Sequence, residues 1–142
     1  MKDKLKRALP KPVFNILRDS IDGVKRIKEL PDAYMHPWRK QSRKGLEAFH
    51  NIHQGKRCFI LGNGPSLKQT DLSKLRNEYT FGMNRIYLAF EELGFQTSYY
   101  VSVNDLVIEQ CAKEILNLNL PRFVSWRAGK KWLSNQEDLF FL

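Results

Sequence analysis

The sequence predicts an α/β protein with a Rossmann-like, open and mostly parallel sheet of about four strands, preceded by N-terminal helices. Two observations carry this prediction. Short apolar runs alternate with segments of helical spacing throughout residues 57–126, and a glycine-rich turn follows the first of these runs. Parallel strands joined by helices give this alternation, and an open sheet of this kind binds phosphates at the carboxyl ends of its strands.

The excess of basic residues lies in the first third of the chain. The protein has 142 residues and a net charge of +9. Residues 1–57 hold 15 Lys and Arg against 6 Asp and Glu, whereas residues 58–142 hold nine of each. We therefore predict a basic helical extension over residues 1–56, followed by the N-terminal half of a Rossmann-like nucleotide-binding domain over residues 57–142.

The composition predicts a cytoplasmic protein. An apolar share of 42% and an aromatic share of 12% are typical of a folded chain. No apolar run reaches transmembrane length, and the N-terminus lacks the apolar core of a signal peptide. We interpret Cys58 and Cys111 as small core residues in a reducing compartment. We also consider peripheral attachment of this cytoplasmic protein to the inner face of the membrane.

The first predicted helix begins at Val13 and is ended by Pro31. Its apolar residues recur at helical spacing: Val13, Ile16, Leu17, Ile21, Val24, Ile27 and Leu30. The opposite face is charged. Two interpretations follow: the helix packs its apolar stripe on the domain, or residues 1–30 make peripheral contact with an anionic membrane or another partner.

A second helix is predicted over residues 41–52, with Leu46, Phe49 and Ile52 as candidate inward residues. His50 and His53 have helical spacing, but no third ligand lies nearby in the sequence, so we interpret them as surface residues and predict no metal site. The basic residues of this region belong to no recognisable binding module, and we therefore predict no nucleic-acid partner.

A glycine-rich turn follows the first predicted strand, residues 58–61, which we expect to be buried on both faces. The turn consists of Gly62, Asn63, Gly64, Pro65 and Ser66. Glycines let the backbone turn and let a ligand approach the main chain, and Ser66 is placed to cap a short helical turn that points free N–H groups at an anion. The pattern is neither the dinucleotide fingerprint nor the P-loop, and a tight turn without a ligand is the alternative interpretation.

The remaining elements alternate along the chain. We expect a helical turn at 71–75, strands at 79–83, 99–103 and 122–126, helices at 85–93 and 106–116, a chain break at Gly129 and the start of a fifth element at 138–142.

An asparagine follows each of three successive predicted strands. These residues are Asn63, Asn84 and Asn104, the last followed by Asp105. Because the carboxyl ends of parallel strands meet at one edge of a sheet, we expect the three side chains to face a common cleft. Asparagine both donates and accepts, which suits recognition of a base, a ribose or a phosphate. For each residue alone, a helix cap or a turn is the alternative interpretation.

Four motifs in order make the chain similar to known families. They are FILGNGPSL, DLSKL, FGMNRIYL and YYVSVND. Together they resemble the 6-hydroxymethylpterin pyrophosphokinase-like (MptE-like) family, and they are also similar to the bacterial sialyltransferases of glycosyltransferase family 42. The resemblance covers residues 57–127 and leaves out the N-terminal third.

The resemblance implies a Rossmann-like transferase. The turn from Gly62 to Ser66 would hold the phosphate and ribose of the donor, and Asn84 and Asn104, with Asp105, would line the same pocket. In the MptE-like interpretation the donor is ATP with Mg²⁺, which transfers diphosphate to a pterin-type alcohol or serves a related step of surface-glycan synthesis. A CMP-sialic-acid-dependent glycosyltransferase is the first alternative. A non-catalytic nucleotide- or membrane-binding protein of the same fold is the second.

Both families continue well beyond the matched part, with later strands that supply a catalytic histidine or acidic residue. This chain ends at Leu142, so we expect it to be an N-terminal fragment of such a transferase, with the catalytic residues unassigned.

Overall fold

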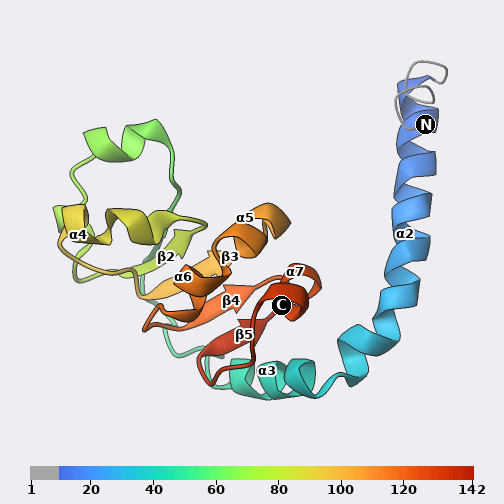
Figure 1. The fold of residues 1–142 in the computed structure, drawn as a ribbon. Coiled ribbons are helices and arrows are strands. Elements are labelled where there is room, and N and C mark those ends of the chain that lie inside the picture. The colour runs from blue at the N-terminus through green and yellow to red at the C-terminus, as the bar shows by residue number, and fades with distance from the viewer. Residues whose placement is uncertain (1–9) are drawn as a thin grey trace. The chain divides into compact units, whose positions relative to one another are not determined.

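The computed structural model describes residues 10–142, which belong to two compact units, one ending at His36 and the other spanning Pro37–Leu142 (Figure 1). Residues 1–9 lie outside the description, and with them the start of the segment predicted to contact a membrane. The unit that holds the sheet begins at Pro37, earlier than the boundary near residue 57 that the sequence suggested. No helix in the described part of the chain is long and apolar enough to cross a membrane.

The first unit is built on one long helix, α2 (Lys11–Met35). The prediction that Pro31 ends this helix is wrong, because Pro31 lies inside it. A proline removes one hydrogen-bond donor and bends a helix, but later turns can still close. The bond of 3.1 Å from His36 N to Asp32 O closes the last turn, and Figure 1 shows the axis bending near this end.

The second unit opens with α3 (Pro37–Glu47), which begins earlier and ends earlier than predicted. Pro37 stands at its first position, where the missing N–H costs no hydrogen bond. The helix packs on the last strand of the sheet. The buried Ser42 accepts a hydrogen bond of 3.0 Å from Phe141 N, and the ring of Trp38 stacks on Phe141 with centroids 6.0 Å apart.

A five-stranded parallel sheet forms the centre of this unit, as the α/β prediction requires. Its strands are β1 (Cys58–Leu61), β2 (Tyr79–Met83), β3 (Tyr99–Ser102), β4 (Arg122–Val124) and β5 (Leu139–Phe141). They lie in the order β1-β2-β3-β4-β5, so each strand pairs with the one that precedes it in the sequence. The fifth strand exceeds the predicted count of four and confirms the element expected at 138–142.

One face of the sheet carries an aromatic cluster. Tyr99, Phe123 and Phe140 are buried in it, and Phe81 packs beside them. Phe49, from the turns that follow α3, contacts three of these rings edge-on, with centroids 5.2–5.9 Å apart. The prediction of a second helix as far as residue 52 fails here, but its inward Phe49 does reach the core.

His53 belongs to the same cluster. Its ring lies over Tyr79 with centroids 3.6 Å apart, and its Nε2 is hydrogen-bonded to the hydroxyl of Tyr99. The interpretation of His53 as an ordinary surface residue is therefore wrong, because aromatic neighbours half-bury it. His50 is exposed.

Strand β1 lies at an edge of the sheet and pairs only with β2. The expectation that it is buried on both faces is wrong: Ile60 is 72% exposed, and Cys58 on the same face is exposed as well. Leu61 points to the opposite face and is buried. Cys111 is buried as predicted.

The connections between strands are short helices. They are η1 (Pro65–Gln69), η2 (Ser73–Leu75), η3 (Ile86–Ala89), α4 (Phe90–Leu93), α5 (Asp105–Gln110), α6 (Ala112–Leu116) and α7 (Trp126–Trp132), the η elements being 3₁₀ helices. The single helices predicted at 85–93 and 106–116 are each split in two.

Helix α7 contradicts the predicted chain break at Gly129 and the strand prediction that reached Trp126. A Cβ at Gly129 would lie 2.7 Å from the ring of Phe141 and 3.1 Å from Val124. Glycine is therefore required here because it lets α7 approach β4 and β5 closely, and it does not interrupt the helix.

A buried cation ties the helical layer to β4. Arg122 is 4% exposed, and its Nη1 donates to Leu116 O and to Gln136 Oε1, each at 2.8 Å. The first acceptor belongs to the last turn of α6, where carbonyls lack helical partners and the helix dipole favours positive charge. Burial lowers the pKa of this guanidinium, and the nearby carboxylate of Asp138 opposes that shift.

Candidate functional site

The candidate site lies where β1 and β2 end, and the turn after β1 forms its first wall. Gly64, with φ −70° and ψ 156°, is the N-cap of η1, and no side chain caps the helix. The prediction that Ser66 caps this turn is therefore wrong. Ser66 lies inside η1, where its carbonyl accepts a bond of 2.9 Å from Thr70 Oγ1. Pro65, which lacks an N–H, takes the first helical position instead.

Asn63 connects this turn to the chain after β2. In the amide orientation that satisfies both of its groups, the side-chain oxygen accepts from Arg85 N at 2.9 Å and from Ile86 N at 3.2 Å. The side-chain nitrogen donates to Met83 O at 2.7 Å. These bonds hold the start of η3 against the glycine-rich turn, so that two connections separate in the sequence form adjoining walls.

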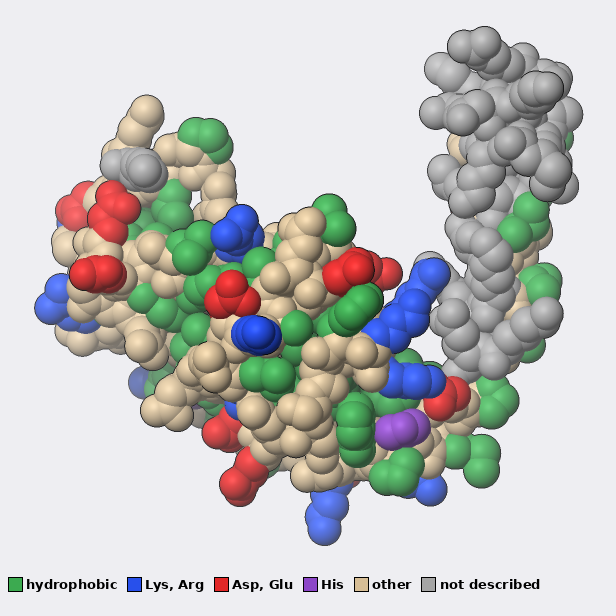
Figure 2. Space-filling view, viewed as in Figure 1, with side chains coloured by type: hydrophobic (Ala, Val, Ile, Leu, Met, Phe, Trp, Pro, Cys, Tyr) green, Lys and Arg blue, Asp and Glu red, His purple; other side chains and the backbone are tan. Residues whose placement is uncertain are grey.

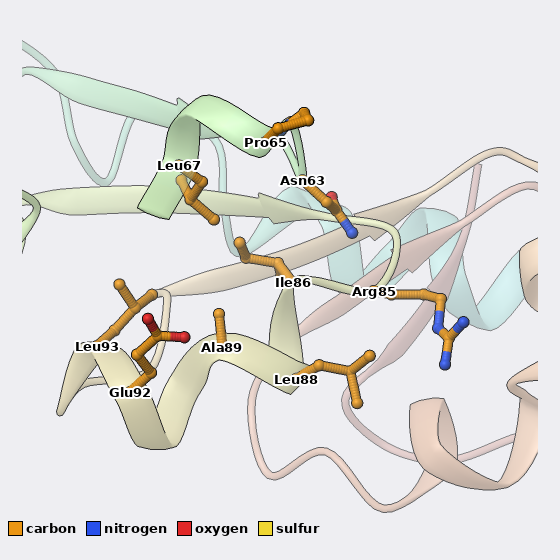
Figure 3. A pocket seen from close by; sticks show the side chains of 10 residues that line it. Asn63, Pro65, Leu67, Arg85, Ile86, Leu88, Ala89, Glu92 and Leu93 are labelled. Carbon is orange, nitrogen blue, oxygen red and sulfur yellow. The ribbon is translucent and has the colours of Figure 1, made fainter. Parts of the chain in front are cut away.

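A cavity of about 480 Å³ lies between these walls (Figure 3). Its lining residues are Asn63, Gly64, Pro65, Leu67, Arg85, Ile86, Leu88, Ala89, Glu92 and Leu93. The middle of this set is apolar. Figure 3 shows the guanidinium of Arg85 and the carboxylate of Glu92 at opposite ends of the group, so the cavity offers a cation at one end and an anion at the other.

Arg85 and Glu92 were not predicted as site residues. Arg85 directly follows Asn84, at the strand end that the sequence had singled out, but it was assigned to the start of a helix. Both residues are exposed. Glu92 shares α4 with Leu93, and only the placement of α4 beside the turn brings it to the cavity.

The fold itself does not require the two glycines of the turn. Neither has a positive φ, and an added Cβ would meet nothing within 4 Å at Gly62 and only Ser66 Oγ, at 3.6 Å, at Gly64. At Gly82, in contrast, an added Cβ would lie 2.5 Å from Ile86 and 2.7 Å from Thr97. In an open turn of this kind, glycine leaves room for a ligand to approach the main chain.

Asn84 holds the end of β2 to β3. Its backbone is left-handed, with φ 53°, a conformation that asparagine tolerates better than most residues. Its N–H donates to Val101 O at 3.0 Å, and its Oδ1 accepts from Ser102 Oγ at 3.2 Å. These contacts describe a turn residue, and Asn84 is not among those that line the cavity.

Asn104 is the N-cap of α5. Its Oδ1 accepts from Leu106 N at 3.0 Å and from Val107 N at 3.3 Å. Asp105 follows in the first turn, where a negative charge suits the helix dipole. Both side chains are exposed at the end of β3.

The predicted site residues therefore fall into two groups, those that line the cavity and those that do not. All three asparagines follow the carboxyl ends of adjacent parallel strands, at one edge of the sheet. Asn63, Gly64 and Pro65 line the cavity, whereas Gly62, Ser66, Asn84, Asn104 and Asp105 do not. The amides of all three asparagines hold main-chain or side-chain groups of the protein itself.

A half-buried tyrosine, Tyr87, and a buried one, Tyr100, lie near these strand ends. Burial raises the pKa of Tyr87, in η3, to about 12, and it also raises the pKa of Tyr100, in β3. Their rings lie 6.3 Å apart. Both phenols therefore stay neutral at physiological pH and add no charge to the site.

The described residues contain no group of three His, Cys, Asp or Glu side chains that could hold a metal ion. Comparison with known proteins gave no match: no family model, no curated protein and no solved structure matches this chain.

Proposed function

We propose that this chain binds the phosphate end of a nucleotide donor in the cavity between the Gly62–Ser66 turn and Arg85, as the donor-binding part of an MptE-like transferase. One observation carries the proposal. The turn after β1 has two glycines that the fold does not need, and one of them, Gly64, lines the cavity together with a cation, Arg85, at the carboxyl ends of the parallel strands. This is the edge at which open α/β sheets bind ligands.

Each part of the cavity has a role in this proposal. The guanidinium of Arg85 is exposed and can form paired, charge-assisted hydrogen bonds to phosphate oxygens. The apolar residues Leu67, Ile86 and Leu88 offer a surface for a base or a sugar ring. Glu92, at the far end, can accept hydrogen bonds from ribose hydroxyls.

The two donor classes differ in what they require of the cavity. ATP is carried with Mg²⁺, an ion that takes carboxylate and phosphate oxygens as ligands. Glu92, the carboxylate among the lining residues, lies at the end away from Arg85, so the phosphates of ATP themselves would hold that ion. A CMP-sugar carries a phosphodiester whose single charge Arg85 would balance without a metal.

Titration calorimetry on the full chain tests the proposal. We expect binding of ATP with Mg²⁺, and Arg85→Gln should weaken it at least tenfold, because hydrogen bonds to charged groups contribute about 1.5–3 kcal/mol. Arg76→Gln is the matched control. Arg76 is exposed and precedes β2, so it lies toward the amino ends of the strands, away from the cavity. Equal affinities for the parent, Arg85→Gln and Arg76→Gln would reject the site.

The same titration separates the donors. If the donor is ATP with Mg²⁺, chelation of the metal should weaken binding to the parent, and Glu92→Gln, which removes a contact with the ribose, should weaken binding equally with and without the metal. Tighter binding of CMP than of ATP, with no dependence on Mg²⁺, would favour the glycosyltransferase. Binding of neither nucleotide would leave a non-catalytic protein of this fold.

A further inference from the structure

We propose that α2 docks its apolar side on an anionic phospholipid surface and lies along the bilayer instead of crossing it. The apolar residues of this helix that the structure describes are largely exposed. They are Val13 42%, Ile16 66%, Ile21 55%, Val24 57%, Ile27 63%, Leu30 44%, Tyr34 59% and Met35 69%. Figure 2 shows hydrophobic side chains along one side of the helix.

The arrangement of these residues favours a bilayer over a second copy of the chain. At about 100° per residue, they spread over roughly half of the helix circumference, a stripe that suits a helix sunk in an interface. A coiled-coil seam is narrower and needs an apolar pair in every heptad. In the register of Val13 and Ile16 the next seam positions are Ser20 and Gly23. In the register of Phe14 and Leu17 the apolar pattern continues at Ile21 and Val24 and stops at Lys28 and Pro31, so neither of these seams runs the length of the helix.

Ser20 is compatible with an apolar surrounding although it lies on the apolar side. Its Oγ donates to Ile16 O at 2.8 Å, within the same helix. A hydroxyl that bonds back to its own helix presents no unpaired donor to lipid.

The charge of the adjoining sequence selects an anionic surface. Residues 1–10 contain four Lys and Arg and one Asp, whereas α2 as a whole carries five basic and four acidic residues. The positive excess therefore precedes the helix, where a basic segment strengthens binding to anionic headgroups. The absence of a helix apolar enough to span the bilayer, among the described residues, agrees with binding in the interface.

Vesicle co-sedimentation of the full chain tests this proposal. Vesicles of phosphatidylcholine alone are compared with vesicles in which about a quarter of the lipid is phosphatidylserine. We expect the chain to bind the anionic vesicles at least tenfold more tightly. Ile16→Glu with Ile27→Glu places two charges on the apolar side and should lower that binding at least tenfold. Asn15→Glu with Ala33→Glu adds the same charge to the polar side and should lower it less than threefold.

Circular dichroism of both variants shows whether α2 still forms. Equal binding by the two double variants, or equal binding of the parent to neutral and anionic vesicles, would overturn the proposal. A third result would also overturn it: the parent binds no vesicles, sedimentation velocity without lipid shows that it forms a dimer, and the Ile16→Glu, Ile27→Glu variant abolishes that dimer. Nucleotide affinity should be the same in all these variants, so this test and that of the proposed function fail separately.

Discussion

The side-chain oxygen of Asn63 accepts a hydrogen bond of 2.9 Å from the main-chain N–H of Arg85. This bond ties the turn after β1 to the residue that supplies the cation of the cavity. Asn63 was predicted to contact the nucleotide directly. In the structure its side-chain amide forms hydrogen bonds with the main chain after β2. Asn63 therefore acts as a positioning residue for Arg85 in the proposed site.

Asn63→Ala should lower both stability and nucleotide affinity. It leaves the N–H groups of Arg85 and Ile86 without their acceptor, and we expect a loss of about 1–3 kcal/mol in the free energy of unfolding by urea. Affinity should fall as far as in Arg85→Gln, because the guanidinium is no longer held in place. Asn119→Ala, at an exposed loop position before β4, is the control and should change neither quantity. A fully stable Asn63→Ala protein would refute the bonding scheme.

Substitution of the turn glycines should separate binding from folding. Because an added Cβ meets open space, Gly62→Ala and Gly64→Ala should leave the free energy of unfolding unchanged or raise it by up to about 1 kcal/mol. Gly64→Ala, at the glycine that lines the cavity, should weaken nucleotide binding at least tenfold by blocking the approach to the main chain, and Gly62→Ala should weaken it less. Gly82→Ala should instead lower stability by about 1–3 kcal/mol through overpacking against Ile86 and Thr97. Undiminished binding by both turn variants would remove the main support for the site.

Asn84 provides a test between a turn residue and a ligand-binding residue. Asn84→Ala should cost about 1–2 kcal/mol of unfolding free energy, because alanine is strained at φ 53°, and Asn84→Gly should recover most of it. If Asn84 only shapes the turn, the glycine variant binds nucleotide like the parent. A loss of affinity in Asn84→Gly with full stability would show that its side chain contacts the ligand, as the sequence predicted.

The buried phenol of Tyr87 predicts a loss of stability at high pH. Its pKa is raised to about 12 in the folded protein, from about 10 for an exposed tyrosine. Its contribution is therefore complete below about pH 10 and is lost as the pH rises toward 12, where the unfolded chain releases the proton first. Between about pH 9 and pH 12, urea unfolding should show the parent losing up to about 2 kcal/mol relative to Tyr87→Phe. A constant difference between the two proteins over this range would contradict the shift.

The bounds of the strands could be predicted closely because each strand is a short apolar run with polar residues on both sides. β1 and β2 begin and end where the sequence placed them, and β3 differs by one residue. The exposure of β1 could not be predicted, because an apolar run gives no information on whether a strand lies at the centre or the edge of a sheet. The helices were less certain. Gly129 and Pro31 were interpreted as residues that interrupt helices. Gly129 is instead required for the close packing of α7 against Phe141, and Pro31 is accommodated within α2.

The candidate site was predicted in location but only partly in its residues. Strand ends and glycines marked the side of the sheet where the structure has the cavity, since topology alone brings them together. Arg85 and Glu92 gave no such signal, because an exposed charge in a helical segment is ordinary in any sequence. The asparagines were interpreted by their ability to bind a ligand, and the sequence could not show that each amide is already paired within the protein.

The sequential order of the strands has a consequence for how this protein is made. Each strand pairs with the one synthesised just before it, so the sheet can grow strand by strand as the chain emerges from the ribosome, through contacts close in sequence. Helix α3 is the exception. Its buried Ser42 and its Trp38 contact Phe141 in β5, so these contacts of the first helix of the unit form only after the fifth strand has been made.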